Sequence, residues 1–295
     1  MRNAIRSRLG QHGLTHGLAL ALLLTVSAVI LIAPAMAIVR LAQVPGKTID
    51  VDVELVLAVD ISLSMDPDEQ RLQREGYIEA LKDPEIHKAI RAGQHRRIAV
   101  TYVEWAGPDN QIHLVPWRLI DGPASAKAFV EELQSKEYSR FRRTSISAAL
   151  EFSARMFGTS PYRGIRRVID VSGDGANNSG PALGPIRERV LADGIVVNGL
   201  PIILRPTMGY SSWDLPNLDK YYASCVIGGP GSFMIPITKP EEFATATRQK
   251  LLQEISSLPA VPRVISTQML PPAGNNQAGE GDYDCTILER GIRRW

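Results

Sequence analysis

The sequence predicts one α/β domain with a doubly wound, mostly parallel central sheet, one antiparallel edge strand and helices on both faces. Three observations support this fold class. Strand-like and helix-like stretches alternate from Val51 to Ile255, the first strand becomes a continuous apolar run, and a turn-rich segment separates two later strands. With 295 residues, of which 44% are hydrophobic and 22% charged, the chain has enough apolar side chains for a substantial core.

The first half of the domain contains local patterns that predict two strands joined by a turn, a central strand and a capped helix. Val51–Val59 (VDVELVLAV) is the expected central strand, because alternation gives way to an apolar run typical of a strand covered on both faces. Asp66–Glu69 supplies an N-cap, a first-turn proline and a capping-box acid, which predicts a helix from Pro67 to Leu81. The strands Arg97–Trp105 and Gln111–Leu119 flank a hairpin-type turn, so one sheet edge is expected to be antiparallel.

The second half continues the alternation. A helix is expected over Ser145–Phe157, because its apolar residues recur at helical spacing on one face. The other expected elements are the strand Arg167–Ser172, the helix Pro185–Ala192, the strand Ile195–Leu204, a strand over Ser224–Ile237 broken at Gly228–Gly231, and a helix over Pro240–Ile255. The predicted domain organisation is a signal peptide at 1–37, a linker at 38–50, the α/β domain at 51–258 and a loosely ordered tail at 259–295.

The N-terminal segment has the order of a secretory signal. Three arginines and no acid precede an apolar run from Leu18 to Ala33, and Ala35-Met36-Ala37 forms a small-x-small cleavage site. The alternative is an uncleaved membrane anchor, since a spanning helix needs roughly 18 apolar residues. We therefore expect a periplasmic or secreted protein, and contact with a membrane only if this segment is uncleaved.

The charge balance argues against a nucleic-acid partner. The formal net charge of +2 includes Arg2, Arg6 and Arg8, and the chain without the signal segment has 30 basic and 31 acidic residues. Binding to phosphates would require a clustered basic face.

Cys225 and Cys285 are the only cysteines. In an oxidising compartment they could form a disulfide, or Cys225 could be buried in an apolar strand with Cys285 free in the tail.

Three polar segments fall where the predicted strands end. Asp60-Ile61-Ser62-Leu63-Ser64 follows the central strand, Thr144 precedes a helix, and Asp174 follows the strand Arg167–Ser172. In an open α/β sheet this edge forms the ligand-binding crevice. Carboxylate and hydroxyl oxygens suit a hard cation, so Mg²⁺ is expected, with Mn²⁺ and Ca²⁺ as alternatives. Each residue also has a structural interpretation, as a turn residue or a helix N-cap.

These residues resemble the metal-ion-dependent adhesion site of the von Willebrand factor A family, which is written D-x-S-x-S, then T, then D. The resemblance covers about Asp52 to Ser257, and the stretches Asp66–Tyr77 and Tyr221–Gly231 are similar to a bacterial branch described as a domain of unknown function. The resemblance implies one divalent cation held by five residues, and a partner protein that presents an Asp or Glu to it. The five implied metal ligands are Asp60, Ser62, Ser64, Thr144 and Asp174.

Other functions fit the sequence less well. A serine hydrolase using the same crevice would need a base beside Ser62 or Ser64, but His87, His95 and His113 are expected on the first helix, the following loop and a strand. A metal-assisted hydrolase would also need a positioned base. The glycine-rich segment Gly228–Gly231 lacks the patterns of nucleotide-binding loops. We therefore expect a binding module and not an enzyme.

Asp68 could mark a second cation position, but an acid in the first turn of a helix also stabilises the helix through its dipole.

Export gives the first testable prediction. If the signal segment is cleaved after Ala37, mass spectrometry of protein from the extracytoplasmic fraction should find Ile38 at or near the new N-terminus. Intact Met1 in the membrane pellet would instead establish an uncleaved anchor.

Overall fold

Strand β1 (Ile49–Asp60) is the central element of a seven-stranded sheet in a computed structural model, which describes residues 48–204, 215, 217–256, 263–264, 284–286 and 288–289. From Leu55 to Val59 its side chains are buried on both faces, as the apolar run predicts. The expected signal segment lies outside the described residues. The expected linker extends two residues too far, because Ile49 and Asp50 already belong to β1.

The sheet has the strand order β3-β2-β1-β4-β5-β6-β7. Only the β2–β3 pair is antiparallel among its pairings, and β3 forms one edge. The strands other than β1 are β2 (Ile98–Trp105), β3 (Gln111–Ile120), β4 (Tyr162–Gly173), β5 (Ile195–Pro201), β6 (Phe233–Met234) and β7 (Arg263–Val264). The predicted fold class, including its antiparallel edge strand, is therefore confirmed.

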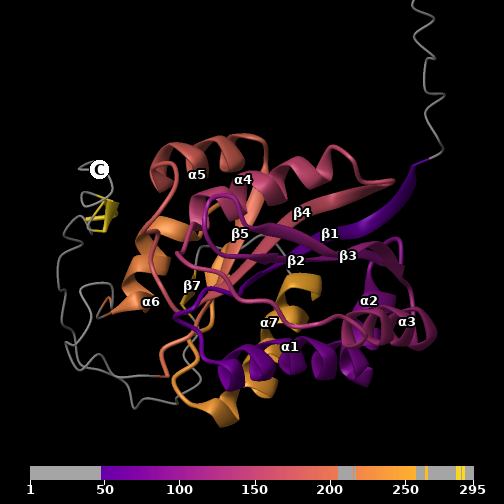
Figure 1. The fold of residues 1–295 in the computed structure, drawn as a ribbon. Coiled ribbons are helices and arrows are strands. Elements are labelled where there is room, and N and C mark those ends of the chain that lie inside the picture. The colour runs from indigo at the N-terminus through magenta and orange to yellow at the C-terminus, as the bar shows by residue number, and fades with distance from the viewer. Residues whose placement is uncertain are drawn as a thin grey trace, which may run out of the picture. The chain divides into compact units, whose positions relative to one another are not determined.

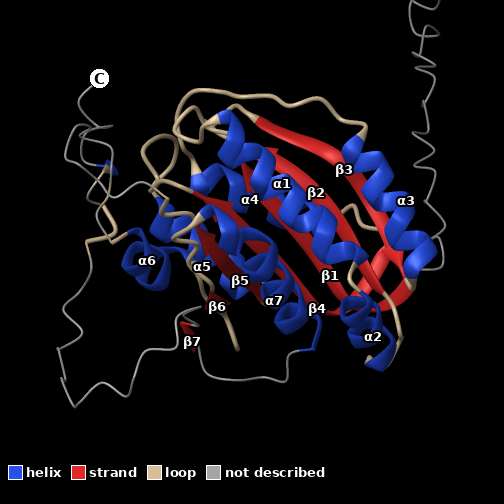
Figure 2. Ribbon diagram, turned by 90° about the horizontal axis from the view of Figure 1, so that it is seen from below, coloured by secondary structure: helices blue, strands red, loops and turns tan. Residues whose placement is uncertain are grey.

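Helices cover both faces of the sheet (Figures 1 and 2). The α-helices are α1 (Pro67–Lys82), α2 (Pro84–Ala92), α3 (Pro123–Gln134), α4 (Ile146–Phe157), α5 (Leu183–Ala192), α6 (Leu218–Tyr221) and α7 (Phe243–Ser256). Helices α1, α2, α3 and α7 lie on one face, whereas α4, α5 and α6 lie on the other, and each layer closes its own apolar core against the sheet.

The starts of α1 and α4 lie within one residue of the predicted positions, whereas α5 begins at Leu183, before the predicted Pro185, and α7 begins at Phe243, after a 3-10 turn over Pro240–Glu242. Asp66 caps α1 by accepting from the backbone N–H of Glu69, and the Glu69 carboxylate accepts from the Asp66 N–H, which completes the predicted capping box. Helix α4 is capped by Ser145, whose Oγ accepts from the Ala148 N–H. Thr144 is therefore not the N-cap, and the structural alternative for this residue is removed.

The prediction of a strand over Ser224–Ile237 is wrong for its first part. Tyr222–Val226 forms a π-helical turn with Tyr222 and Cys225 buried, and only Phe233–Met234 joins the sheet as β6. Periodicity cannot distinguish a short buried helical turn from a buried strand, because both are continuous apolar runs. The intervening glycines reverse the chain, since Gly229 and Gly231 have φ of 91° and 74°, which glycine adopts readily.

Helices α2 and α3 were not predicted from the sequence. Both begin with proline in the first turn, and the side chain of Asp83 accepts from the Glu85 N–H at the start of α2. As a result His87 lies on α2 and not on the first helix. Its Nε2 lies 2.8 Å from the backbone oxygen of Leu81, so the residue has a structural contact within the α1–α2 corner.

Described parts of the C-terminal segment are attached to the domain. Strand β7 pairs in parallel with β6, and a disulfide joins Cys225 in the π-helical turn to Cys285. The alternative of a free Cys285 is therefore wrong. Among the helices that the structure describes, none combines the length and apolarity needed to span a bilayer.

A buried cluster of charges fastens α7 to the sheet. The Lys250 Nζ lies 2.5 Å from both Asp170 Oδ1 on β4 and Glu254 Oε1 on α7, and all three side chains are at most 1% exposed. The Tyr77 hydroxyl donates to Asp170 at 3.2 Å, and the Asn198 amide donates to Glu254 at 3.0 Å. Burial, and then the charge of Asp170, raises the pKa of Glu254 to about 7.

This raised pKa predicts a pH-dependent stability. The folded state holds the Glu254 proton up to about pH 7, whereas the unfolded chain releases it near pH 4.5. The stabilisation is therefore complete at low pH and is lost as the pH rises through this range. Between about pH 4.5 and pH 8, the free energy of unfolding of the wild type should fall by about 3 kcal/mol more than that of Glu254→Gln.

Urea unfolding at several pH values measures this difference. Glu241→Gln provides a matched control, because Glu241 is an exposed acid at the start of the same helical segment and should leave the pH slope unchanged. Parallel pH curves for the wild type and Glu254→Gln would show that Glu254 is ionised in both states.

Candidate metal-binding site

The candidate site lies where β1 and β4 end side by side. These strands are parallel neighbours, with Val59 paired to Ser172, so Asp60 at the end of β1 and Asp174 directly after β4 come together. From β1 the chain builds the sheet outward through β2 and β3, and then returns to the other side of β1 with β4. The two acids therefore lie at the switch point of strand order, where open α/β sheets bind ligands.

A chain of short hydrogen bonds links four of the five predicted residues. The Ser62 N–H donates to Asp60 Oδ1 at 2.7 Å, and the hydroxyls of Ser62 and Ser64 lie 2.8 Å apart. The Ser64 hydroxyl donates to Asp174 Oδ1 at 2.7 Å. The D-x-S-x-S loop and the end of β4 thus present two carboxylates and two hydroxyls to one small volume.

Thr144 reaches the same place from a third loop. Its side chain is buried against Gly175, where an added Cβ would lie 3.5 Å from Thr144 Oγ1. Gly175 directly follows Asp174 in the chain. The hydroxyl of Thr144 therefore lies next to the backbone that carries the second carboxylate. The structure therefore places all five predicted residues at one edge of the sheet.

Asp60 is more buried than the sequence indicated. We expected a carboxylate in a solvent-facing crevice, but Asp60 is 0% exposed. Gly173 permits this burial, because a Cβ at that position would lie only 2.7 Å from Asp60 Oδ2. The opening to solvent is provided by Ser64, which is exposed, and by Asp174, which is half-buried.

Burial makes Asp60 costly to ionise. Desolvation, followed by repulsion from Asp174, raises the pKa of Asp60 well above its ordinary value. Within the described structure, Asp60 Oδ2 is fully buried and has no partner at hydrogen-bond geometry. The Ser62 donors and the Asp174 N–H near this carboxyl lower its pKa by less than burial and repulsion raise it. A buried carboxylate oxygen without a donor, beside a second carboxylate, fits a positive ion as its missing partner.

Helix α1 and the loop before α4 hold the D-x-S-x-S segment in shape. The Gln73 amide donates to the Asp60 backbone oxygen at 3.0 Å, and the Gln70 amide donates to Ser139 O at 2.6 Å. The loop containing Phe141 pairs with the segment like a short parallel strand, through Phe141 N to Ile61 O at 3.1 Å and Leu63 N to Phe141 O at 2.8 Å. These backbone bonds fix the positions of the two serines.

Two asparagines after β4 connect the other two loops. Asn178 exchanges hydrogen bonds with Thr144, since its Oδ1 accepts from Thr144 N and its N–H donates to Thr144 O, both at 2.9 Å. Asn177 Oδ1 accepts from the N–H and the hydroxyl of Ser147, both at 3.1 Å. Asn177 and Asn178 were not among the predicted site residues, although their position shortly after Asp174 and Gly175 was the available signal.

The rim of the site is basic. Arg140 donates to the backbone oxygens of Leu63 and Met65, while Arg142 and Arg143 are exposed on the same loop. Across the described residues, none of these arginines has a carboxylate within ion-pair distance. Leu63 is 47% exposed, so an apolar side chain also projects at this rim.

Asp68 lies in the first turn of α1 and pairs with Arg71 at 3.0 Å. This placement agrees with the helix-terminus interpretation that we preferred over a second cation position.

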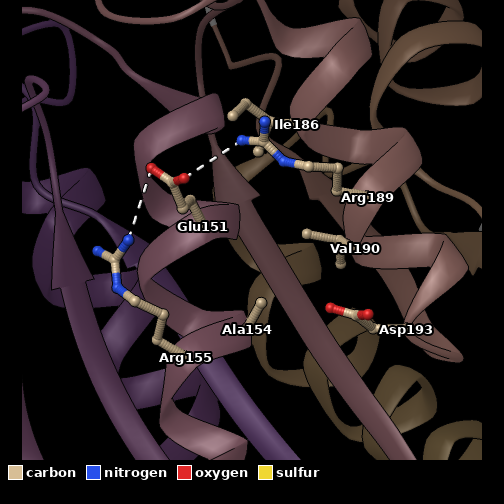
Figure 3. Close-up of a pocket in the computed structure, with 7 residues that line it drawn as sticks. All are labelled: Glu151, Ala154, Arg155, Ile186, Arg189, Val190 and Asp193. Carbon is tan, nitrogen blue, oxygen red and sulfur yellow. Dashed lines mark hydrogen bonds and ion pairs between the residues drawn. The ribbon is translucent and has the colours of Figure 1, made fainter.

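The pocket drawn in Figure 3 lies elsewhere, between α4 and α5. Glu151 projects between Arg155 and Arg189 and forms ion pairs with both, at 3.5 Å and 3.2 Å, and aliphatic side chains such as Val190 complete the lining. These charges offset one another, and none of the five predicted residues lines the pocket.

Comparisons with solved structures show the same fold in distant proteins. The pilus adhesin SpaC from Lactobacillus rhamnosus GG is 12% identical, with a TM-score of 0.53 over 70% of this chain and 31% of that protein. Proximal thread matrix protein 1 from the mussel byssus, with a zinc-occupied MIDAS motif, is 13% identical, with a TM-score of 0.50 over 71% and 49%. A von Willebrand factor type A protein from Catenulispora acidiphila is 18% identical, with a TM-score of 0.46 over 70% and 43%.

The chain spans less than half the length of each of these solved structures. No curated protein matches the sequence significantly. A family model described as "Protein of unknown function (DUF1194)" matches residues 50–259, which is well over half of the chain. The protein therefore belongs to the DUF1194 family, and its domain has the fold of the SpaC adhesin and the mussel matrix protein.

Proposed function

We propose that this protein binds one divalent cation through Asp60, Ser62, Ser64, Thr144 and Asp174, and uses that cation to bind an acidic residue of a partner protein. The observation that carries the proposal is the buried Asp60 Oδ2 without a hydrogen-bond partner, next to a second carboxylate. A cation would supply both the missing contact and the charge that offsets the repulsion between the two acids.

The donor set favours Mg²⁺. Across the described residues, no three His, Cys, Asp or Glu side chains gather into a metal-binding group, and the proposed site combines two carboxylates with three hydroxyls. Hard oxygen donors of low total charge suit Mg²⁺, which retains water ligands, and Mn²⁺ or Ca²⁺ would use the same oxygens. The zinc-occupied motif of the mussel protein supports a divalent ion in a domain of this fold.

The chemistry of the rim supports an acidic partner. Two carboxylates leave a six-coordinate ion able to accept an outside oxygen, and a partner Asp or Glu provides one with a balancing charge. Arg142 and Arg143 are exposed beside the loop that carries Ser62 and Ser64, where they would attract further acids flanking the first. The adhesin and matrix protein of the same fold support a role in binding proteins.

A hydrolase is the alternative use of the same crevice, and the placement of the histidines disfavours it. His113 Nε2 lies 2.8 Å from Thr101 Oγ1 on the edge of the sheet, and His87 contacts Leu81 O on α2. The His95 backbone N–H donates to Asp52 near the start of β1, at the opposite end of the strand from Asp60. Among the described residues, Ser62 and Ser64 thus have a carboxylate neighbour but no histidine base.

Export to the periplasm or cell exterior is part of the proposal. The Cys225–Cys285 disulfide supports it, because structural disulfides persist in oxidising compartments. A metal site exposed at the edge of such a domain would meet Mg²⁺ and partner proteins outside the cytoplasm.

Replacing Asp60 tests the metal site. Asp60→Asn keeps the acceptor for the Ser62 N–H but removes the charge, so isothermal titration with Mg²⁺ or Mn²⁺ should show binding to the wild type and none to the variant. The variant should remain folded, with an unchanged or higher melting temperature in chelator, because the lost carboxylate is buried and repelled by Asp174.

Asp68→Asn is the matched control, since it removes an exposed acid from the neighbouring helix turn and should keep wild-type affinity. Equal affinity in wild type and Asp60→Asn would disprove the assignment.

A glutamate-rich peptide tests the partner. Its fluorescence anisotropy should report binding in Mg²⁺ and none in chelator, and a glutamine peptide of the same length should not bind. The double variant Arg142→Gln with Arg143→Gln should weaken peptide binding by about tenfold, since two exposed charge contacts are each worth up to about 1 kcal/mol, and should not weaken Mg²⁺ binding, because removing positive charge beside a cation site does not disfavour the cation.

Peptide binding that persists in chelator would contradict the metal-dependent role. Turnover of small esters that survives chelation would favour the hydrolase instead.

A further inference from the structure

We propose that Glu289 is a positioning residue of the metal site, and that the Cys225–Cys285 disulfide anchors the segment that carries it. This inference rests on the proposed metal-binding function, because it concerns how the loops of that site are held. Glu289 lies at the far end of the described chain, and its side chain is only 5% exposed.

Glu289 accepts two hydrogen bonds inside the domain. Its Oε1 lies 3.0 Å from Asn177 Nδ2 and 2.8 Å from the Leu183 N–H. Leu183 is the first residue of α5, so the carboxylate sits at the N-terminal end of a ten-residue helix, where the helix dipole favours a negative charge. A buried acid with these two donors is part of the structure of the loop between β4 and α5.

Asn177 connects this carboxylate to the loops of the metal site. One end of its side chain donates to Glu289, while its Oδ1 accepts from the backbone and the hydroxyl of Ser147 on α4. Its backbone N–H donates to the hydroxyl of Tyr221. The next residue, Asn178, exchanges two hydrogen bonds with Thr144. The orientation of Asn177 therefore sets how the loop after Asp174 sits against Thr144.

Loss of the Glu289 carboxylate would loosen this arrangement. The Leu183 N–H would remain buried without its acceptor, and Asn177 Nδ2 would keep only its bond to Pro181 O at 3.2 Å. Outer residues that orient metal ligands typically contribute about 10- to 100-fold to metal affinity. Glu289 acts through Asn177 and Asn178 in this way, on Thr144 and on the loop of Asp174.

The disulfide explains how a distant residue is held there. Cys285 is four positions before Glu289, and its bond to Cys225 fixes the segment against the π-helical turn beside α6. Within the segment, the Glu289 N–H donates to Thr286 O at 3.0 Å. The side chain of Glu289 is therefore delivered to Asn177 by a short, anchored turn.

Mn²⁺ titration of the full chain tests the proposal. Glu289→Ala should weaken Mn²⁺ binding by about tenfold or more. Glu289→Gln should remain near wild type, because its amide oxygen can accept from the same two donors. Glu188→Ala is the matched control, since it removes an exposed acid from α5, the helix whose first N–H Glu289 accepts, and should leave the affinity unchanged. A folded Glu289→Ala protein with wild-type Mn²⁺ affinity would overturn the positioning role.

The anchor is tested by replacing both cysteines with serine. The affinity of this protein should fall towards that of Glu289→Ala, and adding Glu289→Ala to it should cause little further loss, because the two changes act on one contact. Wild-type affinity without the disulfide would overturn the anchoring role.

Hydrogen exchange separates this inference from the proposed function. In metal-free protein, the amides of Thr144 and Asn178 should exchange faster in Glu289→Ala than in the wild type or Glu188→Ala. Unchanged exchange would show that Glu289 does not hold these loops. If the wild type binds no Mn²⁺, the proposed function fails and the positioning role for metal fails with it, while faster exchange would still establish the contact to the loops.

Discussion

The structure of the site depends on one unfavourable arrangement, the complete burial of Asp60 beside a second carboxylate. Inside a protein, two like charges repel more strongly than in water, and a buried carboxylate also loses its hydration. The surrounding residues hold the chain in this arrangement. Gly173 gives the carboxylate room, Gln73 fixes the backbone of Asp60, and the serines relay hydrogen bonds to Asp174. This arrangement distinguishes the five residues from an ordinary polar turn, and it is the reason we propose a cation there.

Much of the fold and the five candidate residues could be predicted because their signals are local or follow from strand direction. The apolar run of β1 and the capping box of α1 are short patterns with one physical interpretation. The proximity of Asp60 and Asp174 could be predicted because the carboxyl ends of parallel strands lie at one edge of the sheet. Among the five candidate residues, only the burial of Asp60 differs from expectation, because burial depends on Gly173 and on neighbouring strands that no local pattern describes.

The supporting contacts could not be predicted, since they join residues far apart in sequence by single hydrogen bonds. Glu289 is 112 positions from Asn177, and nothing in the polar tail marks it as buried. The π-helical turn at Tyr222–Val226 was mistaken for a strand because its apolar composition suits either structure. Helices α2 and α3 were not predicted, although each has a proline in its first turn as a start signal. Sequence patterns therefore indicate the five candidate residues better than the residues that contact and orient them.

The disulfide also changes the connectivity of the chain. Cys225 and Cys285 are 60 positions apart and enclose all of α7 in a covalent ring. By loop-closure entropy, a ring of this size stabilises the fold by about 4 kcal/mol, because the unfolded chain loses that much freedom. The ring also protects the attachment of the residues after Cys285. A protease that cuts one peptide bond between the two cysteines releases no fragment, so Glu289 stays covalently joined to the domain until the disulfide is broken as well.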